Sequence, residues 1–198
     1  MRIETVAGTA EIALEGPEDA RLLVLLTHGS NGTVDAPDLT AVREAALALD
    51  AAVARITQPF RLAGRRAPGS PAKQDAAWLE AVAEVRARVP SAPLVQCGRS
   101  NGARVACRTA AEAGAVGVLA LAFPLHPPGK PEKSRAGELR EAGVPVVVVN
   151  GDRDPFGVPD PVDAAEVVVL AGERHDLNRD PARVGAAVAP WLRRWRSR

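Results

Sequence analysis

The chain has 198 residues, 46% of them hydrophobic, which predicts one domain over residues 1–198 with a sizeable core. Its 25 Lys and Arg residues balance 24 Asp and Glu residues along the whole chain, which argues against nucleic acid or a membrane surface as a partner. The N-terminus carries acidic residues where a signal peptide needs an apolar core, and no apolar run approaches the roughly 18 residues of a membrane span. We therefore expect a cytoplasmic protein.

The first elements along the chain are two short segments, 2–6 and 10–14, in which polar and apolar side chains alternate. This period of two predicts a hairpin at the edge of a sheet. The continuous apolar runs that follow are typical of buried parallel strands, and longer stretches of helical period separate them. Together they predict an α/β fold, a mostly parallel sheet with helices on both faces. The predicted strands are 21–29, 51–60, 93–98, 115–124, 145–151 and 166–172.

Helical spacing of apolar residues is clear over 78–89 and looser over 42–49, and we interpret both as packing stripes. The last predicted helix begins with Asp180 as a possible N-cap and Pro181 in its first turn. Pro190 is expected to kink or divide this helix, because a proline inside a helix removes a hydrogen bond.

Cofactor and metal chemistry is not indicated by the sequence. The three histidines are dispersed without ligand spacing, and no glycine-rich phosphate loop is present. Cys97 and Cys107 are too few for a disulfide framework, so we expect two reduced, buried thiols and no cofactor.

Ser100 is the candidate nucleophile. Residues Gly98 to Gly102 read Gly-Arg-Ser-Asn-Gly, which matches the G-x-S-x-G elbow, a sharp turn between a strand and a helix. The apolar run before it and the helical segment after it supply that context. The alternative is a serine that only caps a helix N-terminus.

A serine nucleophile needs a base and an acid to orient that base. Asp152 and Asp154 follow one predicted strand, and His175 follows the next. Carboxyl ends of parallel strands meet at one edge of a sheet, so these loops should lie beside Ser100. The order Ser, Asp, His is also that of the α/β-hydrolase fold.

Backbone amides could stabilise an oxyanion at this site. The segment Thr27 to Gly32 lies at the end of the predicted strand 21–29, which is the third strand when the two of the hairpin are counted. Gly29 would allow a close approach there, and Ser30 would donate one N–H. The second N–H would come from Asn101, the residue after the nucleophile. His28 is interpreted as a structural ring rather than a second base.

Five blocks together resemble the α/β-hydrolase-like family that contains the testis-expressed hydrolase-like proteins and a chromatin-complex scaffold subunit, with dienelactone-hydrolase relatives. The blocks read THGSNG, GRSNGARVA, FPLHPPGKPEKSR, GDRDPFG and GERHDL. The resemblance implies an α/β-hydrolase fold, with a sheet of eight or slightly fewer strands. It implies Ser100 as nucleophile, His175 as base and Asp154 as acid, with Asp152 as a possible substitute.

The function expected from these residues is hydrolysis of a small ester, thioester or related acyl substrate through an acyl-enzyme. The connection 125–143 is too short for a lid domain, which favours small substrates. Two alternatives stay open: a catalytically silent binding or scaffold protein with this fold, and an acyltransferase that uses the same residues.

His126 and Lys130 lie in this connection, in the stretch rich in proline. We hypothesise that they bind an anionic group of the substrate at the mouth of the cleft. Equally, the prolines could simply stiffen the connection while the charges stay solvated.

Overall fold

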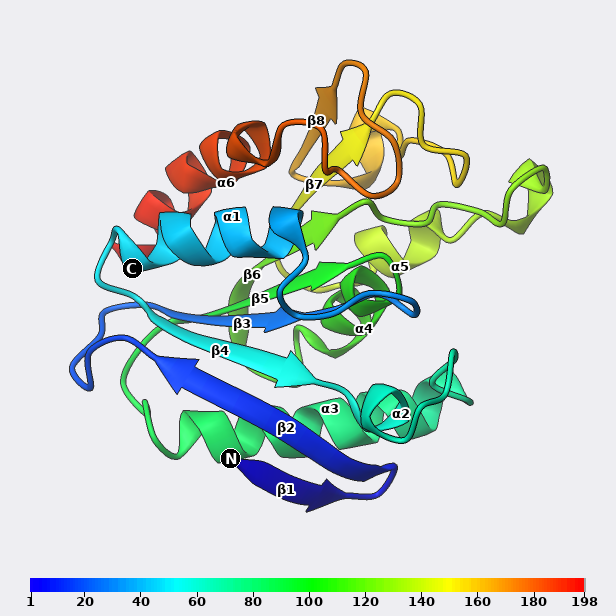
Figure 1. The fold of residues 1–198 in the computed structure, drawn as a ribbon. Helices are drawn as coiled ribbons and strands as arrows, with labels where there is room; N and C mark the ends of the chain where they lie inside the picture. The colour runs from blue at the N-terminus through cyan, green and yellow to red at the C-terminus, as the bar shows by residue number, and fades with distance from the viewer. Residues whose placement is uncertain (198) are drawn as a thin grey trace.

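An eight-stranded sheet in the order β1-β2-β4-β3-β5-β6-β7-β8 runs through the computed structural model, which describes residues 1–197 (Figure 1). The neighbours from β4 to β8 are parallel, and the hairpin β1–β2 joins β4 antiparallel. The predicted edge hairpin and the six predicted strands are thereby confirmed. The strands are β1 (Arg2–Thr5), β2 (Gly8–Glu15), β3 (Leu23–Thr27), β4 (Ala52–Thr57), β5 (Leu94–Arg99), β6 (Ala115–Leu121), β7 (Val146–Gly151) and β8 (Glu166–Leu170).

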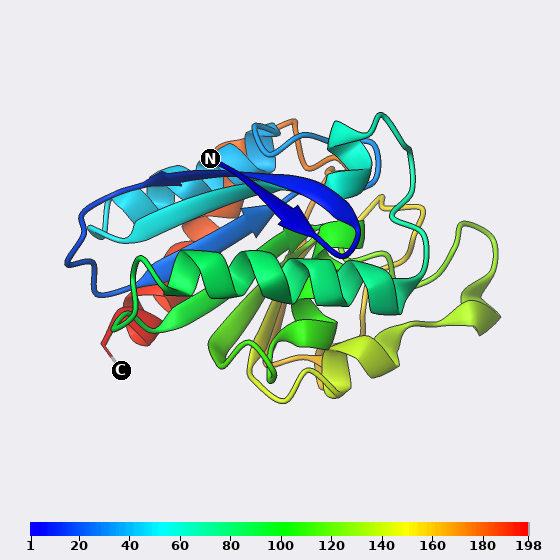
Figure 2. The ribbon, with the colours of Figure 1, turned by 90° about the horizontal axis from the view of Figure 1, so that it is seen from below.

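Helices cover both faces of the sheet, as predicted. Helices α1 and α6 pack side by side on one face, whereas α3, α4 and α5 lie on the other (Figures 1 and 2). The helices are α1 (Pro37–Leu47), α2 (Pro59–Leu62), α3 (Pro71–Arg86), α4 (Asn101–Thr109), α5 (Ala136–Arg140) and α6 (Pro181–Arg196), with short 3₁₀ turns η1 (Pro131–Lys133) and η2 (Pro161–Asp163).

Each central strand contributes to two separate apolar clusters, because successive side chains point to opposite faces. In β3, Leu23 and Leu25 pack with α3 and α4, whereas Val24 and Leu26 pack with α1 and α6. All four are fully buried. This explains why the sequence of a two-sided strand is a continuous apolar run rather than an alternating one.

The two cysteines divide between these clusters. Cys97 on β5 packs on the α1 and α6 side, and Cys107 on α4 packs on the opposite side. Both are free and fully buried, and burial raises the pKa of the Cys97 and Cys107 thiols. The expectation of two buried, reduced thiols is confirmed.

Helix α6 begins as predicted, with Asp180 at its N-cap position, but Pro190 does not divide it. The helix continues from Pro181 through Pro190 without division, and the Asp180 side chain makes no capping hydrogen bond. Pro190 is exposed, so water can solvate the carbonyl group that lost its partner. The opposite face buries Val184 and Leu192, among others, and this packing holds the helix together.

The connection between β6 and β7 carries only η1 and α5. Figure 1 shows it projecting beyond the sheet edge at which the parallel strands end. The prediction that the fold lacks a lid domain is therefore confirmed. Over residues 1–197, no helix combines the length and the apolar character needed to cross a bilayer.

Candidate active site

Ser100 occupies a sharp turn between the end of β5 and the start of α4. Its backbone has φ +53° and ψ −115°, a strained conformation for a residue with a side chain. Its N–H donates to the carbonyl of Leu121 on β6 at 2.9 Å, which fixes the turn to the sheet. The Ser100 side chain makes no capping hydrogen bond, so the alternative of a simple helix-capping serine is wrong.

The two glycines of the elbow are required by sterics. A Cβ on Gly98 would lie 2.1 Å from the backbone carbon and oxygen of Gly102. A Cβ on Gly102 would in turn lie 2.7 Å from the carbonyl oxygen of His28. Strand β5, helix α4 and the loop after β3 can therefore approach one another only because both residues lack side chains.

Three side chains that are far apart in the sequence form one hydrogen-bonded chain. Ser100 Oγ lies 2.9 Å from Nε2 of His175, and Nδ1 of the same ring lies 2.8 Å from Oδ2 of Asp154. The Asp154 carboxylate is buried, and His175 is partly exposed. With Nδ1 donating to the carboxylate, Nε2 is left as the acceptor for the serine hydroxyl proton.

The carboxylate of Asp154 is held by its own loop. Its Oδ1 accepts from the Phe156 N–H at 2.8 Å, and its Oδ2 accepts from Asn150 Nδ2 at 3.3 Å. The Phe156 ring packs on the His175 ring with centroids 4.2 Å apart. Asp152, the alternative acid, is exposed and accepts from the N–H of Gly172 at 2.7 Å. The structure therefore brings Asp154, and not Asp152, to His175.

Two backbone amides near Ser100, those of Ser30 and Asn101, are candidates for an oxyanion site. A Cβ on Gly29 would lie 3.0 Å from the Ser100 Cβ, so the loop that contains Ser30 approaches the nucleophile closely. Within residues 1–197, neither the Ser30 N–H nor the Asn101 N–H donates to another group of the chain. Such free donors are what an oxyanion site requires.

His28 is buried and acts within the loop rather than at the nucleophile. Its Nε2 accepts from the Gln58 N–H at 3.0 Å, so Nδ1 carries the proton and donates to the Gly29 carbonyl at 2.9 Å. Burial lowers the pKa of His28 to about 4, so the ring is neutral near pH 7. The structure thus places His28 as a structural ring, as the sequence indicated.

A chain of amide side chains connects this loop to the elbow. Gln74 Nε2 is 2.7 Å from Gln58 Oε1 and 2.6 Å from Asn101 Oδ1. Since Gln58 also binds His28, the two amides of the candidate oxyanion site are linked through α3. This network holds the Asn101 side chain through its Oδ1.

Family comparison supplies an independent observation. A family model described as an alpha/beta hydrolase domain matches residues 20–182. The chain belongs to the alpha/beta hydrolase family. This membership supports a hydrolase function, whereas the narrower resemblance to the testis-expressed hydrolase-like proteins stays a prediction. A comparison with curated proteins gives no match.

Solved structures of other alpha/beta hydrolases share the fold. Est1E from Butyrivibrio proteoclasticus, solved with ferulic acid, is 16% identical with a TM-score of 0.81 over 100% of both chains. A serine hydrolase without a lid from Xanthomonas campestris is 19% identical (TM-score 0.76, 98% of this chain and 93% of that one). Dienelactone hydrolase from Anabaena variabilis is 17% identical (TM-score 0.72, 98% and 94%).

The pocket next to Ser100 in this alpha/beta hydrolase is lined by Phe156, Pro124 and three arginines: Arg99, Arg104 and Arg135. Neither His126 nor Lys130 lines it. The His126 ring instead packs against Gly157, because a Cβ added to Gly157 would lie 2.5 Å from His126 Nε2. Lys130 is exposed. The structure therefore does not bring these two predicted anion-binding residues to the serine.

The reason is a backbone hydrogen bond that closes the loop. The Arg135 N–H donates to the Leu125 carbonyl at 2.7 Å, which pinches residues 126–134 into a projection away from the pocket. Arg135 itself stays at the base of the projection, beside the serine. Arg135 is not among the predicted site residues, and the run of prolines before it is the local signal that the chain turns back there.

Arg99 and Asp38, also not among the predicted site residues, form a buried ion pair behind the elbow. Arg99 Nε lies 3.1 Å from Oδ2 of Asp38, whose side chain is fully buried at the start of α1. Burial raises the pKa of Asp38 to about 6, although the Arg99 cation acts in the opposite direction. Arg99 Nη2 also donates to the His175 carbonyl at 3.0 Å. No local sequence pattern signals these contacts.

No metal site is evident in the part of the chain that the structure describes. Residues 1–197 contain no group of three or more His, Cys, Asp or Glu side chains arranged to hold an ion.

Proposed function

We propose that this alpha/beta hydrolase cleaves a small ester, thioester or related acyl substrate through an acyl-enzyme on Ser100. The observation that carries the proposal is the 2.9 Å contact between Ser100 Oγ and His175 Nε2, with Asp154 bound to the opposite ring nitrogen. A serine hydroxyl is a poor nucleophile at neutral pH, and this arrangement supplies the base that activates it.

Each residue has a defined role in the proposed reaction. His175 removes the Ser100 proton as Oγ attacks the acyl carbonyl, and Asp154 orients the ring and stabilises the imidazolium. The Ser30 and Asn101 amides bind the oxyanion. His175 then protonates the leaving group, and water, activated by the same ring, releases the acyl group. We propose a small-molecule substrate, because only short loops surround the pocket.

Labelling with a fluorophosphonate tests this proposal, because the probe reacts with an activated serine and needs no knowledge of the substrate. We expect wild type to be modified on the peptide containing Ser100, as read by mass spectrometry. S100A should not be labelled, and H175A should be labelled at least 100-fold more slowly. Replacing the exposed Ser91, in the turn before β5, is the matched control and should change nothing.

An ester and thioester panel follows from positive labelling. S100A and H175A should each lower kcat by about 10⁴-fold or more, because the nucleophile and its base act as one unit and the loss of either removes the function of both. A folded wild-type protein that neither labels nor hydrolyses any ester would contradict the proposal and favour a binding protein with a hydrolase fold.

A further inference from the structure

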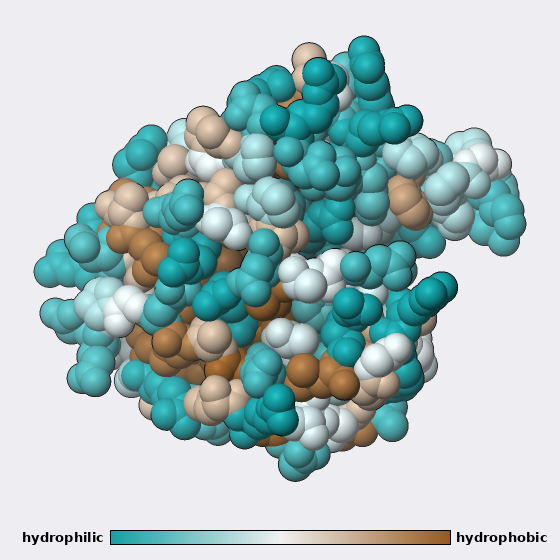
Figure 3. Space-filling view, viewed as in Figure 1, coloured by the Kyte–Doolittle hydropathy of each residue, from teal (hydrophilic) through white to brown (hydrophobic). Residues whose placement is uncertain are grey.

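The pocket beside Ser100 is positively charged. Three guanidinium groups line it, from Arg99, Arg104 and Arg135, and none of the described residues in its lining is an Asp or Glu. The edge of the molecule that carries these loops is mostly hydrophilic on the surface (Figure 3). A charged lining is unusual for a site whose substrates are neutral apolar esters, because ligand pockets are mostly apolar with few polar groups.

Two of the three arginines are already neutralised by the protein. Arg99 is paired with Asp38, as described above. Arg104 binds Glu138 through two parallel contacts, Nε to Oε2 at 2.9 Å and Nη2 to Oε1 at 2.5 Å. These pairs hold both guanidinium groups in place, and the partner carboxylates largely neutralise the charges of Arg99 and Arg104.

Arg135 has no such partner. Within residues 1–197, no carboxylate lies within ion-pair distance of its guanidinium, and its one side-chain hydrogen bond runs from Nη1 to the Pro124 carbonyl at 2.8 Å. The side chain is half-buried. Burial and the neighbouring Arg104 cation lower the pKa of Arg135, whereas the Glu138 carboxylate acts in the opposite direction from beyond ion-pair distance. The group stays charged near pH 7. The half-buried cation thus has no carboxylate of residues 1–197 bound to it.

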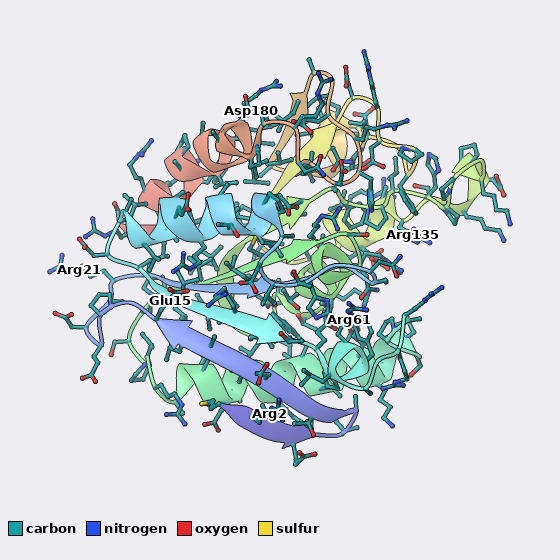
Figure 4. All side chains as sticks on the ribbon, in the orientation of Figure 1. Arg2, Glu15, Arg21, Arg61, Arg135 and Asp180 are labelled. Atoms are coloured by element: carbon teal, nitrogen blue, oxygen red, sulfur yellow. The ribbon has the colours of Figure 1, made fainter. Side chains whose placement is uncertain are left out.

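The position of Arg135 is fixed by the fold. Its N–H is bound to Leu125 and its Nη1 to Pro124, so both ends are attached to the segment that leaves β6. Figure 4 labels Arg135 at the sheet edge where the parallel strands end. Since one guanidinium nitrogen is used by Pro124, the remaining N–H groups are available to a ligand.

We propose that the substrate carries a carboxylate in addition to its ester or thioester bond, and that Arg135 binds this carboxylate. The inference rests on the proposed serine hydrolase function. A guanidinium matches the planar carboxylate with two parallel N–H···O bonds, which a neutral ester cannot offer. The substrate class is therefore an acid ester, with the carboxylate either on the acyl group or on the leaving group.

Paired substrates test the inference and distinguish its two forms. For the acyl side, mono-p-nitrophenyl glutarate is compared with its neutral methyl ester. For the leaving-group side, 4-acetoxybenzoate is compared with methyl 4-acetoxybenzoate. Each rate is corrected for hydrolysis without enzyme, and kcat/KM is compared between wild type and R135Q for each compound, so that intrinsic reactivity cancels.

We expect R135Q to lower kcat/KM for the acid of one pair by about 10- to 100-fold, the loss of a charge-assisted contact. Its neutral partner should change less than about threefold, and R135K should recover part of the loss. K133A, which removes an exposed cation of the same segment, is the control and should leave all four compounds unchanged. Equal losses for acid and neutral esters, or no loss with R135Q, would overturn the inference.

A second readout does not depend on turnover. Monomethyl glutarate should slow fluorophosphonate labelling of wild-type Ser100 and should not slow labelling of R135Q. If Ser100 labels and hydrolyses neutral esters without this protection and without acid preference, the carboxylate inference fails and the hydrolase proposal stands. If wild type never labels, the hydrolase proposal itself fails.

Discussion

Arg99 connects the nucleophile loop to the loop of His175. Its Nη2 donates to the His175 carbonyl at 3.0 Å, and its Nε lies 3.1 Å from the buried Asp38 carboxylate. A Cβ on Gly29 or on Gly32 would lie 3.5 Å from its Nη1, so the same side chain also contacts the loop after β3. One guanidinium, from the variable position of the elbow motif, thus lies close to three segments: the His175 loop, the start of α1 and the loop after β3.

Removing this guanidinium should destabilise the protein strongly. R99A leaves the Asp38 charge buried without a partner, which costs about 3–5 kcal/mol of unfolding free energy in comparable pairs. Denaturant titration measures the loss at pH 7.5. R2A, which breaks the exposed pair of Arg2 with Glu11, is the control and should leave the midpoint unchanged. The double variant D38N/R99A should recover part of the loss, and a single variant as stable as wild type would contradict this reading.

Buried Asp38 and His28 should give the stability opposite pH dependences. The pKa of Asp38 is raised to about 6, so between about pH 4 and 6 the folded state holds a proton that the unfolded state has released. Stability therefore falls as pH rises through this window. The pKa of His28 is lowered to about 4, so between about pH 4 and 6.5 only the unfolded state binds the proton, and stability rises with pH.

These two contributions should largely cancel in wild type and separate in the variants. Relative to wild type, the stability of D38N should rise from pH 4 to 6, because only the His28 contribution remains, and the stability of H28Q should fall, because only the Asp38 contribution remains. Each difference amounts to at most about 3 kcal/mol over the window. Denaturant titrations at half-unit pH steps measure the slopes. Parallel curves for wild type and either variant would show that the replaced group does not titrate in that window.

Asn150 should be a positioning residue for the acid. Its Nδ2 donates to Asp154 Oδ2 at 3.3 Å and to the Gly157 carbonyl at 3.1 Å, and its Oδ1 accepts from the Phe123 N–H at 2.9 Å. N150A should slow fluorophosphonate labelling of Ser100 by about 10- to 100-fold through misplacement of the acid. It should also cost about 1–3 kcal/mol, because buried donors and acceptors lose their partners.

The exposed Asn178 supplies the matched control for that experiment. N178A should label at the wild-type rate and unfold at the wild-type midpoint. If N150A loses stability and still labels at the wild-type rate at a temperature where it is fully folded, Asn150 serves the fold alone.

Gly98 and Gly114 are glycines for different reasons: Gly98 because a side chain would clash, and Gly114 because its backbone has a positive φ. G98A would place a Cβ 2.1 Å from the backbone of Gly102, so we expect a loss above about 3 kcal/mol or no cooperative folding. Gly114 has φ +64° with no atom near its would-be Cβ, so G114A should cost only about 1–2 kcal/mol. Thermal unfolding of both variants measures the contrast. Equal losses would mean that the elbow relaxes around an added methyl group.

The sheet, Ser100 and His175 could be predicted because their signals are local, whereas the choice of Asp154 over Asp152 came from the family resemblance. Strands buried on both faces produce unbroken apolar runs, and residues just after parallel strands must meet at one edge. The Asp38–Arg99 pair could not be predicted, because it depends on how closely α1 and β5 approach each other. Charge alone does not tell which of several scattered arginines will face inward.

The errors have equally physical causes. His126 and Lys130 were predicted at the cleft because they follow β6, and the bond between Arg135 and Leu125 that turns them away joins positions ten residues apart. The expectation that Pro190 could divide the last helix considered the missing hydrogen bond and not the packing of the opposite helix face. Sequence patterns indicate which side chains are apolar. How a loop closes, and whether packing offsets a lost hydrogen bond, depends on contacts between distant segments.

The two buried thiols lie one on each side of the sheet, so their reactivity can be used to measure how often each helical layer separates from the sheet. A thiol reagent can reach Cys97 only when α1 and α6 separate from the sheet, and it can reach Cys107 only when α3 and α4 separate from it. The rates at which the two cysteines are modified under native conditions would therefore measure the free energies of opening of the two layers separately. Helices around the sheet could then be ranked by how readily they detach, with no residue replaced and no label attached beforehand.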